Sequence, residues 1–282
     1  MGEARCGRSR DGSKLSSRAL YTISAPAKLT LSLRVTGRRD DGYHLLDAEM
    51  VSIDLADTLE LDDGDGITIV DEVVGGLGTR SIPSDEQNLV SRALALLGRS
   101  AAVRLVKRIP HGAGLGGGSA DAAAVLRWAG VEDYELALRL GSDVPFCLRG
   151  GRARVTGVGE VVEPLEHEPR SFVLLLPPLA VSTASVYRAF DDRQRLGAGE
   201  VSESDCYNDL EAAAVDVAPG LARWRECFGE ASGTRPNLAG SGSAWWLEGD
   251  LASLGLERRS FLVLGGRRAP LVQVHTVDRE PV

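Results

Sequence analysis

Strict alternation of apolar and polar residues marks the segment APAKLTLSL near the start of the chain. Successive side chains of a strand point to opposite faces, so Leu29, Leu31 and Leu33 share one face. Lys28 and Thr30 lie on the other face. This pattern predicts a strand with one face in the core and the other face available for a functional site.

Further periodic segments follow, and turn residues separate them. A turn within TGRRDDGYHLL ends the first strand, and MVSIDLADTLELD predicts the next one. A helix is predicted over residues 85–98, with Asp85 or Ser84 as its N-cap and Gly98 as its end.

A polar stretch in the middle of the chain divides the pattern. It is preceded by a predicted helix over residues 132–140 and by residues 141–165, which predict a short loop and then strand-rich sequence. The polar stretch itself, PLEHEPR at 164–170, separates two apolar regions, as a domain boundary commonly does. The chain is therefore predicted to form two lobes, residues 20–166 and residues 167–282.

The second lobe begins with the predicted strand SFVLLLPP. A helix at 183–191, a glycine- and acid-rich loop to about residue 204 and a helix from residue 208 follow. Strands in AWWLEG and LVQVHTV, around a short helix, end the pattern. Residues 1–19 lack such periodicity, and their polar composition predicts a flexible extension. A transit peptide is the less favoured alternative, because no apolar face accompanies the basic residues.

A glycine-rich loop lies in the first lobe, within PHGAGLGGGSADAAA. Five glycines occur within seven positions: Gly112, Gly114, Gly116, Gly117 and Gly118. This density is entropically costly, which indicates a sharp turn or a close approach of the backbone to a ligand. Ser119 is a suitable N-cap and Asp121 suits a first turn, so a helix is predicted to begin at Ser119. The loop and helix start predict a phosphate site, with a tight surface turn as the alternative.

Two common phosphate motifs do not fit this loop. The GxxxxGK[ST] motif fails because no lysine follows the last glycine. Gly112, Gly114 and Gly117 match GxGxxG, but the dinucleotide fingerprint also needs a second strand with an acidic residue at its end. The sequence that follows, EDYELALRL, has a helical pattern instead.

Composition narrows the functional classes. The 282 residues are 43% hydrophobic, enough for a substantial core, and carry a net charge of −8, which argues against a nucleic-acid-binding surface. The longest apolar run, residues 172–176, is too short to cross a bilayer. The four cysteines form no CxxC pair and no zinc-ligand spacing with histidine, so free thiols in a reducing cytoplasm are expected.

The segment PHGAGLGGGSADAAA resembles the phosphate-binding loop of the GHMP kinases, which include galactokinase, homoserine kinase and mevalonate kinase. APAKLTLSL, GRRDDGYHLL, LGSDVPFCL, NDLEAA and LAGSGSAWW resemble, in that order, one branch of this family. The likeness covers residues 24–247. It implies a two-lobe α/β (α+β) fold, with an N-terminal ATP-binding lobe like ribosomal protein S5 domain 2 and a ferredoxin-like C-terminal lobe.

The resemblance implies roles for two residues that say little alone. Taken alone, Lys28 is a solvated strand charge and Asp143 a turn residue before Val-Pro. In the family's motifs these two positions form the catalytic couple. Asp143 would accept the proton of the C2 hydroxyl of a methylerythritol that carries cytidine diphosphate, and Lys28 would keep that carboxylate ionised. ATP would supply the phosphoryl group, in a step of non-mevalonate isoprenoid biosynthesis.

The resemblance also implies where the two ligands bind. Tyr43 would stack on the cytosine ring, His44 would bind its polar edge, and Tyr187, otherwise a core aromatic, would close the sandwich. Gly240 and Ser241 would line the site from the second lobe, with a simple hairpin turn as the alternative. The residues expected at ATP are Asn88, Lys107, Pro110, Gly112, Gly114, Leu115, Gly116, Gly117, Gly118, Ser119 and Ala120.

Three positions carry specific qualifications. Thr30 stands where the family commonly has asparagine, so a substrate contact there is expected to be weaker or water-mediated. Lys107 is assigned to the adenine side, with a solvated loop charge as the alternative. Mg²⁺ is expected as the second cofactor, carried on the ATP phosphates; Ser119 is the best single candidate ligand, and no protein ligand is assigned.

Two rival functions remain open. The chain could be another GHMP kinase, acting on a small alcohol such as mevalonate or homoserine. Such a substrate has no base, so Tyr43, His44 and Tyr187 would have no ring to bind. A nucleotide-binding sensor without catalysis is the other, although an intact Lys28 and Asp143 argue against it. The expected partner is a small-molecule substrate, without nucleic acid or membrane, and the chain is expected to be a monomer or a weak homodimer.

Overall fold

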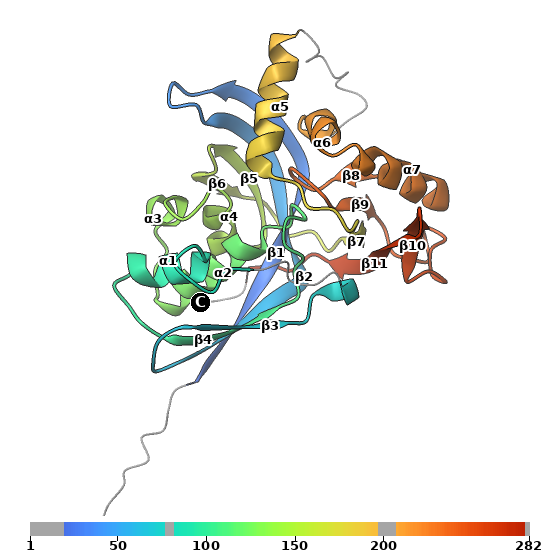
Figure 1. The fold of residues 1–282 in the computed structure, drawn as a ribbon. Coiled ribbons are helices and arrows are strands. Elements are labelled where there is room, and N and C mark those ends of the chain that lie inside the picture. The colour runs from blue at the N-terminus through green and yellow to red at the C-terminus, as the bar shows by residue number, and fades with distance from the viewer. Residues whose placement is uncertain (1–19, 77–81, 197–206, 280–282) are drawn as a thin grey trace, which may run out of the picture.

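The computed structural model describes residues 20–76, 82–196 and 207–279. Within these residues it is a mixed α/β fold with two sheets (Figure 1). The extension expected over residues 1–19 and most of the loop expected before residue 204 lie outside the described residues. None of the helices in the described part of the chain has the length and hydrophobicity that a bilayer crossing requires.

The first sheet has six strands and is built on a long hairpin. Its strands are β1 (Tyr21–Arg38), β2 (His44–Asp62), β3 (Ile67–Asp71), β4 (Ala102–Lys107), β5 (Arg152–Gly157) and β6 (Val161–Pro164). They are ordered β3-β4-β2-β5-β6, with β1 paired to β2. This antiparallel pair runs from Tyr21 opposite Leu61 to Arg38 opposite His44, and it forms the curved blue ribbon at the centre of Figure 1.

The alternation in β1 predicts the strand correctly but not its surroundings. Leu29, Leu31 and Leu33 are all buried. A register shift after Thr30 interrupts the pairing with β2, and Leu33 packs in a different hydrophobic cluster from the other two leucines. Lys28 and Thr30 are buried as well, so the face predicted to be open is covered by other parts of the chain.

Helices cover one side of the first sheet. They are α1 (Leu89–Leu96), α2 (Gly117–Trp128), α3 (Tyr134–Leu138) and α4 (Val144–Arg149). The central helix α2 packs against β1, α1 and α4, and its buried residues include a run of alanines at 122–124. Small side chains allow this helix to lie close to the sheet, which brings its N-terminus near β1.

Three predictions in this lobe are wrong in detail. The N-cap of α1 is Asn88, whose side chain accepts a hydrogen bond from Val90 N, and neither Ser84 nor Asp85 takes this position. The helix after the glycine loop begins at Gly117 and not at Ser119. Helix α4 lies where a loop and strands were expected, because a proline in the first turn of a helix is compatible with helical geometry.

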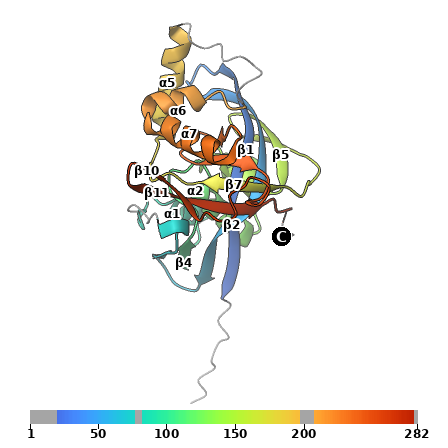
Figure 2. The same ribbon diagram turned by 90° about the vertical axis from the view of Figure 1, so that its right-hand side faces the viewer.

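The second lobe is a sheet of five strands with helices on one face. The strands are β7 (Ser171–Leu175), β8 (Asn237–Leu238), β9 (Trp245–Glu248), β10 (Phe261–Leu264) and β11 (Arg267–His275), in the order β10-β11-β7-β9-β8. The helices are α5 (Thr183–Arg195), α6 (Glu211–Val217) and α7 (Gly220–Ser232). Figure 2 shows α6 and α7 above strands β7, β10 and β11. The short helix expected before the last strand is absent from residues 249–266, where turns and the β10–β11 hairpin occur.

A shared hydrophobic cluster joins the two sheets. It contains Leu29 and Ile53 from the first sheet together with Phe172 and Trp246 from the second. The first sheet ends with Pro164 in β6 and the second begins with β7, so the predicted boundary between residues 166 and 167 falls in the connection. The division into two domains remains a prediction.

Candidate active site

Lys28 lies in β1 with its charge almost completely enclosed. The residue is 5% exposed, and its Nζ lies 3.1 Å from Thr30 Oγ1 and 3.6 Å from Asp143 Oδ2. Reading Lys28 alone as a solvated strand charge is therefore wrong. A buried ammonium is costly unless polar groups surround it, so the pairing with Asp143 and Thr30 is what permits this position.

Asp143 comes from a different element and remains accessible. It stands immediately before α4, and its side chain is 35% exposed. The structure therefore brings together the two residues that the sequence indicated as a couple, with the lysine sealed and the carboxylate open on one side. This arrangement suits a carboxylate that accepts a proton from a ligand while a fixed cation holds it ionised.

The glycine-rich loop is bonded to both lobes. Lys28 N donates to Leu115 O at 3.0 Å, which attaches the loop to β1. On its other side, Ala244 N donates to Ala113 O at 3.0 Å, which attaches it to the turn between β8 and β9. A hollow of about 250 Å³, lined in part by Pro110 and by residues 176–180, adjoins the loop. These two backbone bonds hold the glycine-rich loop in place between the lobes.

Two glycines are required by space as well as by backbone angle. Gly114 has φ +76°, and a Cβ there would lie 2.0 Å from the carbonyl oxygen of Ala239. Gly116 has φ +69°, and a Cβ there would lie 2.8 Å from Lys28 Cγ. Both approaches are closer than any side chain allows, so the loop lies directly against Lys28 and the second lobe.

Helix α2 begins behind this loop with free N–H groups. Its N-cap is Gly116, which provides no side-chain cap, and the first backbone bond runs from Ala120 N to Gly116 O at 2.9 Å. The N–H groups at 117–119 consequently have no acceptor within the helix. A loop of this kind followed by an uncapped helix start is a favourable anion site.

A buried ionic cluster, which sequence analysis missed, fixes both ends of the glycine loop. Lys107, at the end of β4, is 3% exposed, and its Nζ bonds to Asp57 and, at 2.5 Å, to Asp121 Oδ2 on α2. Asp57 Oδ1 also accepts a bond from Ile109 N at 2.9 Å. The cluster of Asp57, Lys107 and Asp121 therefore ties the strand before the loop to the helix after it.

Burial shifts the titration of this cluster. Burial raises the pKa of Asp121 to about 7, Lys107 opposes that rise, and the neighbouring Asp57 adds to it. The pKa of Lys107 is raised, because the two carboxylates outweigh the effect of burial. The alternative of a solvated loop charge at Lys107 is wrong, and its assignment to the adenine side remains a prediction.

The signal for Asp57 was present in the sequence. In LADTLEL it shares a strand face with Leu55 and Leu59, both of which are buried. A charged residue on an apolar strand face needs a buried partner. The alternation pattern therefore indicated a buried ion pair, although it could not identify Lys107 or Asp121 as the partners.

An aromatic cluster forms where the tip of the β1–β2 hairpin meets α5 (Figure 1). The rings of His44 and Tyr187 are stacked with centroids 4.7 Å apart, and Phe190 contacts His44 edge-on at 6.1 Å. Tyr43 is next to them in sequence and 58% exposed. Burial and the charge of Asp143 raise the pKa of Tyr187, which keeps its hydroxyl protonated.

The remaining predicted residues hold defined positions. Asn88 donates from Nδ2 to Pro83 O at 2.8 Å, besides capping α1. Gly240 lies beside Lys28, since a Cβ there would be 3.1 Å from Nζ. Ser241 Oγ is 2.8 Å from Thr183 Oγ1 of α5. Gly240 and Ser241 lie in the hairpin turn between β8 and β9, and this turn also packs against the glycine loop.

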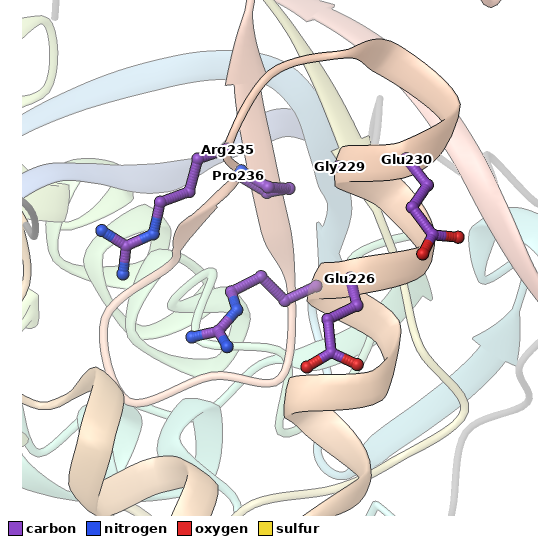
Figure 3. Close-up of a pocket in the computed structure, with 6 residues that line it drawn as sticks. Glu226, Gly229, Glu230, Arg235 and Pro236 are labelled. Atoms are coloured by element: carbon purple, nitrogen blue, oxygen red, sulfur yellow. The ribbon is translucent and has the colours of Figure 1, made fainter.

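A hollow of about 330 Å³ on α7 lies apart from all of these residues (Figure 3). Arg225 and Arg235 line it, and both guanidinium groups bond Glu211 Oε1, at 2.7 and 3.1 Å. Glu226 and Glu230 also line it. Its charges therefore compensate one another. Neither this hollow nor any other part of the described chain has a group of three or more His, Cys, Asp or Glu side chains that could hold a metal ion.

The fold and the loop define the class of protein. A family model described as GHMP kinases N terminal domain matches residues 88–151. A solved homoserine kinase from Cytophaga hutchinsonii shares the fold with a TM-score of 0.54 at 18% identity, covering 92% of this chain and 95% of its own. The architecture is that of the GHMP kinases.

Relatives with higher identity narrow the class. A 4-diphosphocytidyl-2-C-methyl-D-erythritol kinase from Paracoccus denitrificans is 37% identical over 79% of this chain and 94% of its own, and one from Thiobacillus denitrificans is 40% identical over 78% and 83%. A solved structure of a 4-(cytidine 5'-diphospho)-2C-methyl-D-erythritol kinase matches with a TM-score of 0.64 at 33% identity, over 91% of this chain and all of the other. The chain belongs to the 4-diphosphocytidyl-2-C-methyl-D-erythritol kinase family.

Proposed function

We propose that this protein transfers the γ-phosphoryl group of ATP to the C2 hydroxyl of 4-diphosphocytidyl-2-C-methyl-D-erythritol, in non-mevalonate isoprenoid precursor biosynthesis. The products are the 2-phosphate and ADP. The observation that carries the proposal is the buried Lys28, 3.6 Å from Asp143 and in contact with the glycine loop, in a chain of this kinase family.

Asp143 is the general base in this mechanism. Its carboxylate accepts the proton of the C2 hydroxyl as the oxygen attacks the γ-phosphorus, and the bond to the β-phosphate oxygen breaks. Lys28 stabilises the ionised form of Asp143 and offsets negative charge near the transferred group. Because Thr30 and the surrounding backbone hold Lys28 in place, its charge needs little reorganisation during the reaction.

The glycine loop fits the triphosphate. At Gly114 and Gly116 the loop approaches its neighbours too closely for a side chain, and the N–H groups at 117–119 face it without helical partners. Ser119 is the best single candidate for a contact to Mg²⁺, and no protein ligand is assigned. When bound, Mg²⁺ would neutralise phosphate charge. Asn88 and Lys107 are assigned to the adenine side.

The aromatic cluster accounts for the cytidine end of the substrate. Tyr43 is exposed and can stack on a base. The rings of His44 and Tyr187 are stacked on each other and so hold each other in a fixed orientation. We further propose a small-molecule substrate, no nucleic-acid or membrane partner, a cytoplasmic location, and a monomer or weak homodimer. The net charge of −8 argues against a nucleic-acid partner.

The test is ADP release by purified protein with ATP and Mg²⁺, with the cytidine compound, mevalonate or homoserine as acceptor. We expect turnover only with the cytidine compound and a loss of about 10²–10⁴-fold in kcat for Asp143→Asn, the range of general-base catalysis. Asp133→Asn removes an exposed carboxylate that caps α3 and serves as the matched control. Turnover with another alcohol would refute the substrate, and ATP binding without turnover would favour a sensor.

A further inference from the structure

Asp191, in the second lobe, bonds to the ring of His44 in the first lobe. It lies on α5, one helical turn beyond Tyr187. Its Oδ1 is 2.6 Å from His44 Nε2, and its Oδ2 is 3.4 Å from Arg38 Nη1. The side chains of His44 and Asp191 are 11% and 17% exposed, so water competes little for this bond. Nothing in the proposed chemistry uses Asp191 directly.

This contact determines which ring nitrogen carries the proton. A carboxylate is only an acceptor, so Nε2 of His44 must be the donor in the bond to Asp191. In a neutral imidazole the other nitrogen, Nδ1, is then an acceptor. Nδ1 has no hydrogen-bond partner among the described residues. Tyr187 and Phe190 restrict rotation of the ring, so the acceptor has a fixed direction.

We propose that Asp191 is a positioning residue that sets the base specificity of this site. By holding the proton on Nε2, it presents Nδ1 of His44 as an acceptor for the exocyclic amino group of cytosine. Uracil carries a carbonyl oxygen at that position, and two acceptors facing each other leave both unpaired, which is costly in a site shielded from water. The inference rests on the proposed function, because it requires a nucleobase at His44.

The competing explanation is that Asp191 only links the two lobes structurally. Asp191 also bonds to Arg38, and both bonds link the β1–β2 hairpin to α5. Loss of a tie would weaken both pyrimidine substrates equally. If Asp191 instead keeps the proton of His44 on Nε2, its loss would weaken binding of the cytidine compound more than binding of the uridine compound. Only this second outcome changes the ratio of their kcat/KM values.

Steady-state kinetics with the cytidine compound and the matching uridine compound separate the two explanations. For Asp191→Asn, whose amide can donate as well as accept, we expect a KM for the cytidine compound raised about tenfold. The kcat should stay within about threefold, and the cytidine-to-uridine ratio of kcat/KM should fall at least about fivefold. A ratio within about twofold of the wild-type ratio would overturn the proposal.

Two variants serve as controls. Asp192→Asn changes the neighbouring residue, whose exposed side chain bonds Arg195 and no other side chain in the described part of the chain, so both kinetic constants should match the wild type. Arg38→Ala breaks the tie to Asp191 and leaves the bond to His44. It should lower activity toward both compounds by the same factor, and a changed ratio would contradict the assignment to Asp191.

A spectroscopic measurement decides the proton position without activity. ¹⁵N NMR of histidine-labelled protein, with His44→Gln to identify the signal among the four histidines, should show a protonated Nε2 and an unprotonated Nδ1. Asp191→Asn should shift proton density toward Nδ1. A wild-type His44 protonated on Nδ1, or on both nitrogens, would overturn the inference. If the wild type fails to phosphorylate the cytidine compound, the proposed function is wrong, and this spectrum still reports on Asp191.

Discussion

At the scale of single residues, Thr30 is part of the environment of Lys28. The ammonium has three donors, and Thr30 Oγ1 takes one of them at 3.1 Å. Asp143 Oδ2, at 3.6 Å, is its ion-pair partner. Thr30 therefore supplies the acceptor that a buried cation needs, whereas the sequence predicted only a weaker or water-mediated contact with the substrate.

Replacing Thr30 by valine tests this role. Valine keeps the branched shape in the strand but removes the acceptor, so the Lys28 ammonium loses a partner at a cost of about 1–3 kcal/mol. We expect a fall in kcat of about 5–50-fold, since the charge beside Asp143 loses its fixed position. Thr30→Asn, which restores an acceptor, should recover most of the activity. Thr22→Val, on an exposed part of the same strand, should have no effect, and an unchanged kcat in Thr30→Val would refute the role.

At the scale of elements, the glycine loop depends on the absence of a side chain at Gly116. In Gly116→Ala the new Cβ would lie 2.8 Å from Lys28 Cγ, at φ +69°. We expect a loss of at least about 100-fold in kcat/KM, because a displacement of the catalytic lysine by about 1 Å is enough to cause it. Gly130→Ala has a similar φ of +71° with nothing within 4 Å. This control should cost about 1 kcal/mol of stability and leave the kinetic constants intact.

The buried cluster beneath the loop predicts a pH effect on stability. The pKa of Asp121 is about 7 in the folded protein and 3.8 without burial, so between these values the folded state holds a proton that the unfolded state has released. This contribution is full below pH 4 and is lost as the pH rises to about 7, by up to about 1.4 kcal/mol per pH unit. In Asp121→Asn the contribution should vanish.

Urea unfolding between pH 4 and pH 8 measures this effect. The unfolding free energy of the wild type should fall with rising pH relative to Asp121→Asn, while the amide keeps an acceptor for Lys107. Asp133→Asn controls for the loss of one carboxylate at an exposed position. A difference between wild type and Asp121→Asn that stays constant across this range would show that Asp121 is ionised throughout.

These elements also show how far the sequence predicts the structure. Local pattern was enough for β1, for the turn after it and for the loop before α2, because alternation and glycine density are local signals. It misplaced the start of α2 at Ser119, since the backbone geometry at Gly116 depends on what the loop packs against. Helix α4 was missed because six residues carry too little periodicity.

The candidate site, too, could be predicted only in part from the sequence. The couple of Lys28 and Asp143 was indicated by motif resemblance. The burial of Lys28 was not, because it involves Gly240 in the β8–β9 turn of the second lobe, which lies beside Nζ. Asp191 is four residues after Tyr187 on one helix face, but its partner His44 is 147 positions away in sequence. Such pairs arise from the tertiary fold, which a single sequence does not reveal.

At the scale of the whole molecule, the lobes are joined along the central hairpin. Val277 N bonds to Ser52 O at 2.9 Å, and Asp54 accepts bonds from His275 of β11. Beneath these contacts lies the shared cluster, in which the Phe172 ring meets Trp246 edge-on at 5.4 Å. A site assembled from both lobes, with the glycine loop bonded to each, requires such a joint to keep its distances fixed.

This joint predicts that the two lobes unfold together. Phe172 is fully buried in the shared cluster, so Phe172→Ala should cost about 3–5 kcal/mol. Because the cluster belongs to both sheets, calorimetry should record one transition for the wild type and one, at lower temperature, for the variant. Phe261→Ala, on the edge strand β10 and 38% exposed, should shift that transition much less. Two separate transitions, or a shift confined to one of them, would mean that each lobe folds independently and that the contacts around Lys28 rest on docking alone.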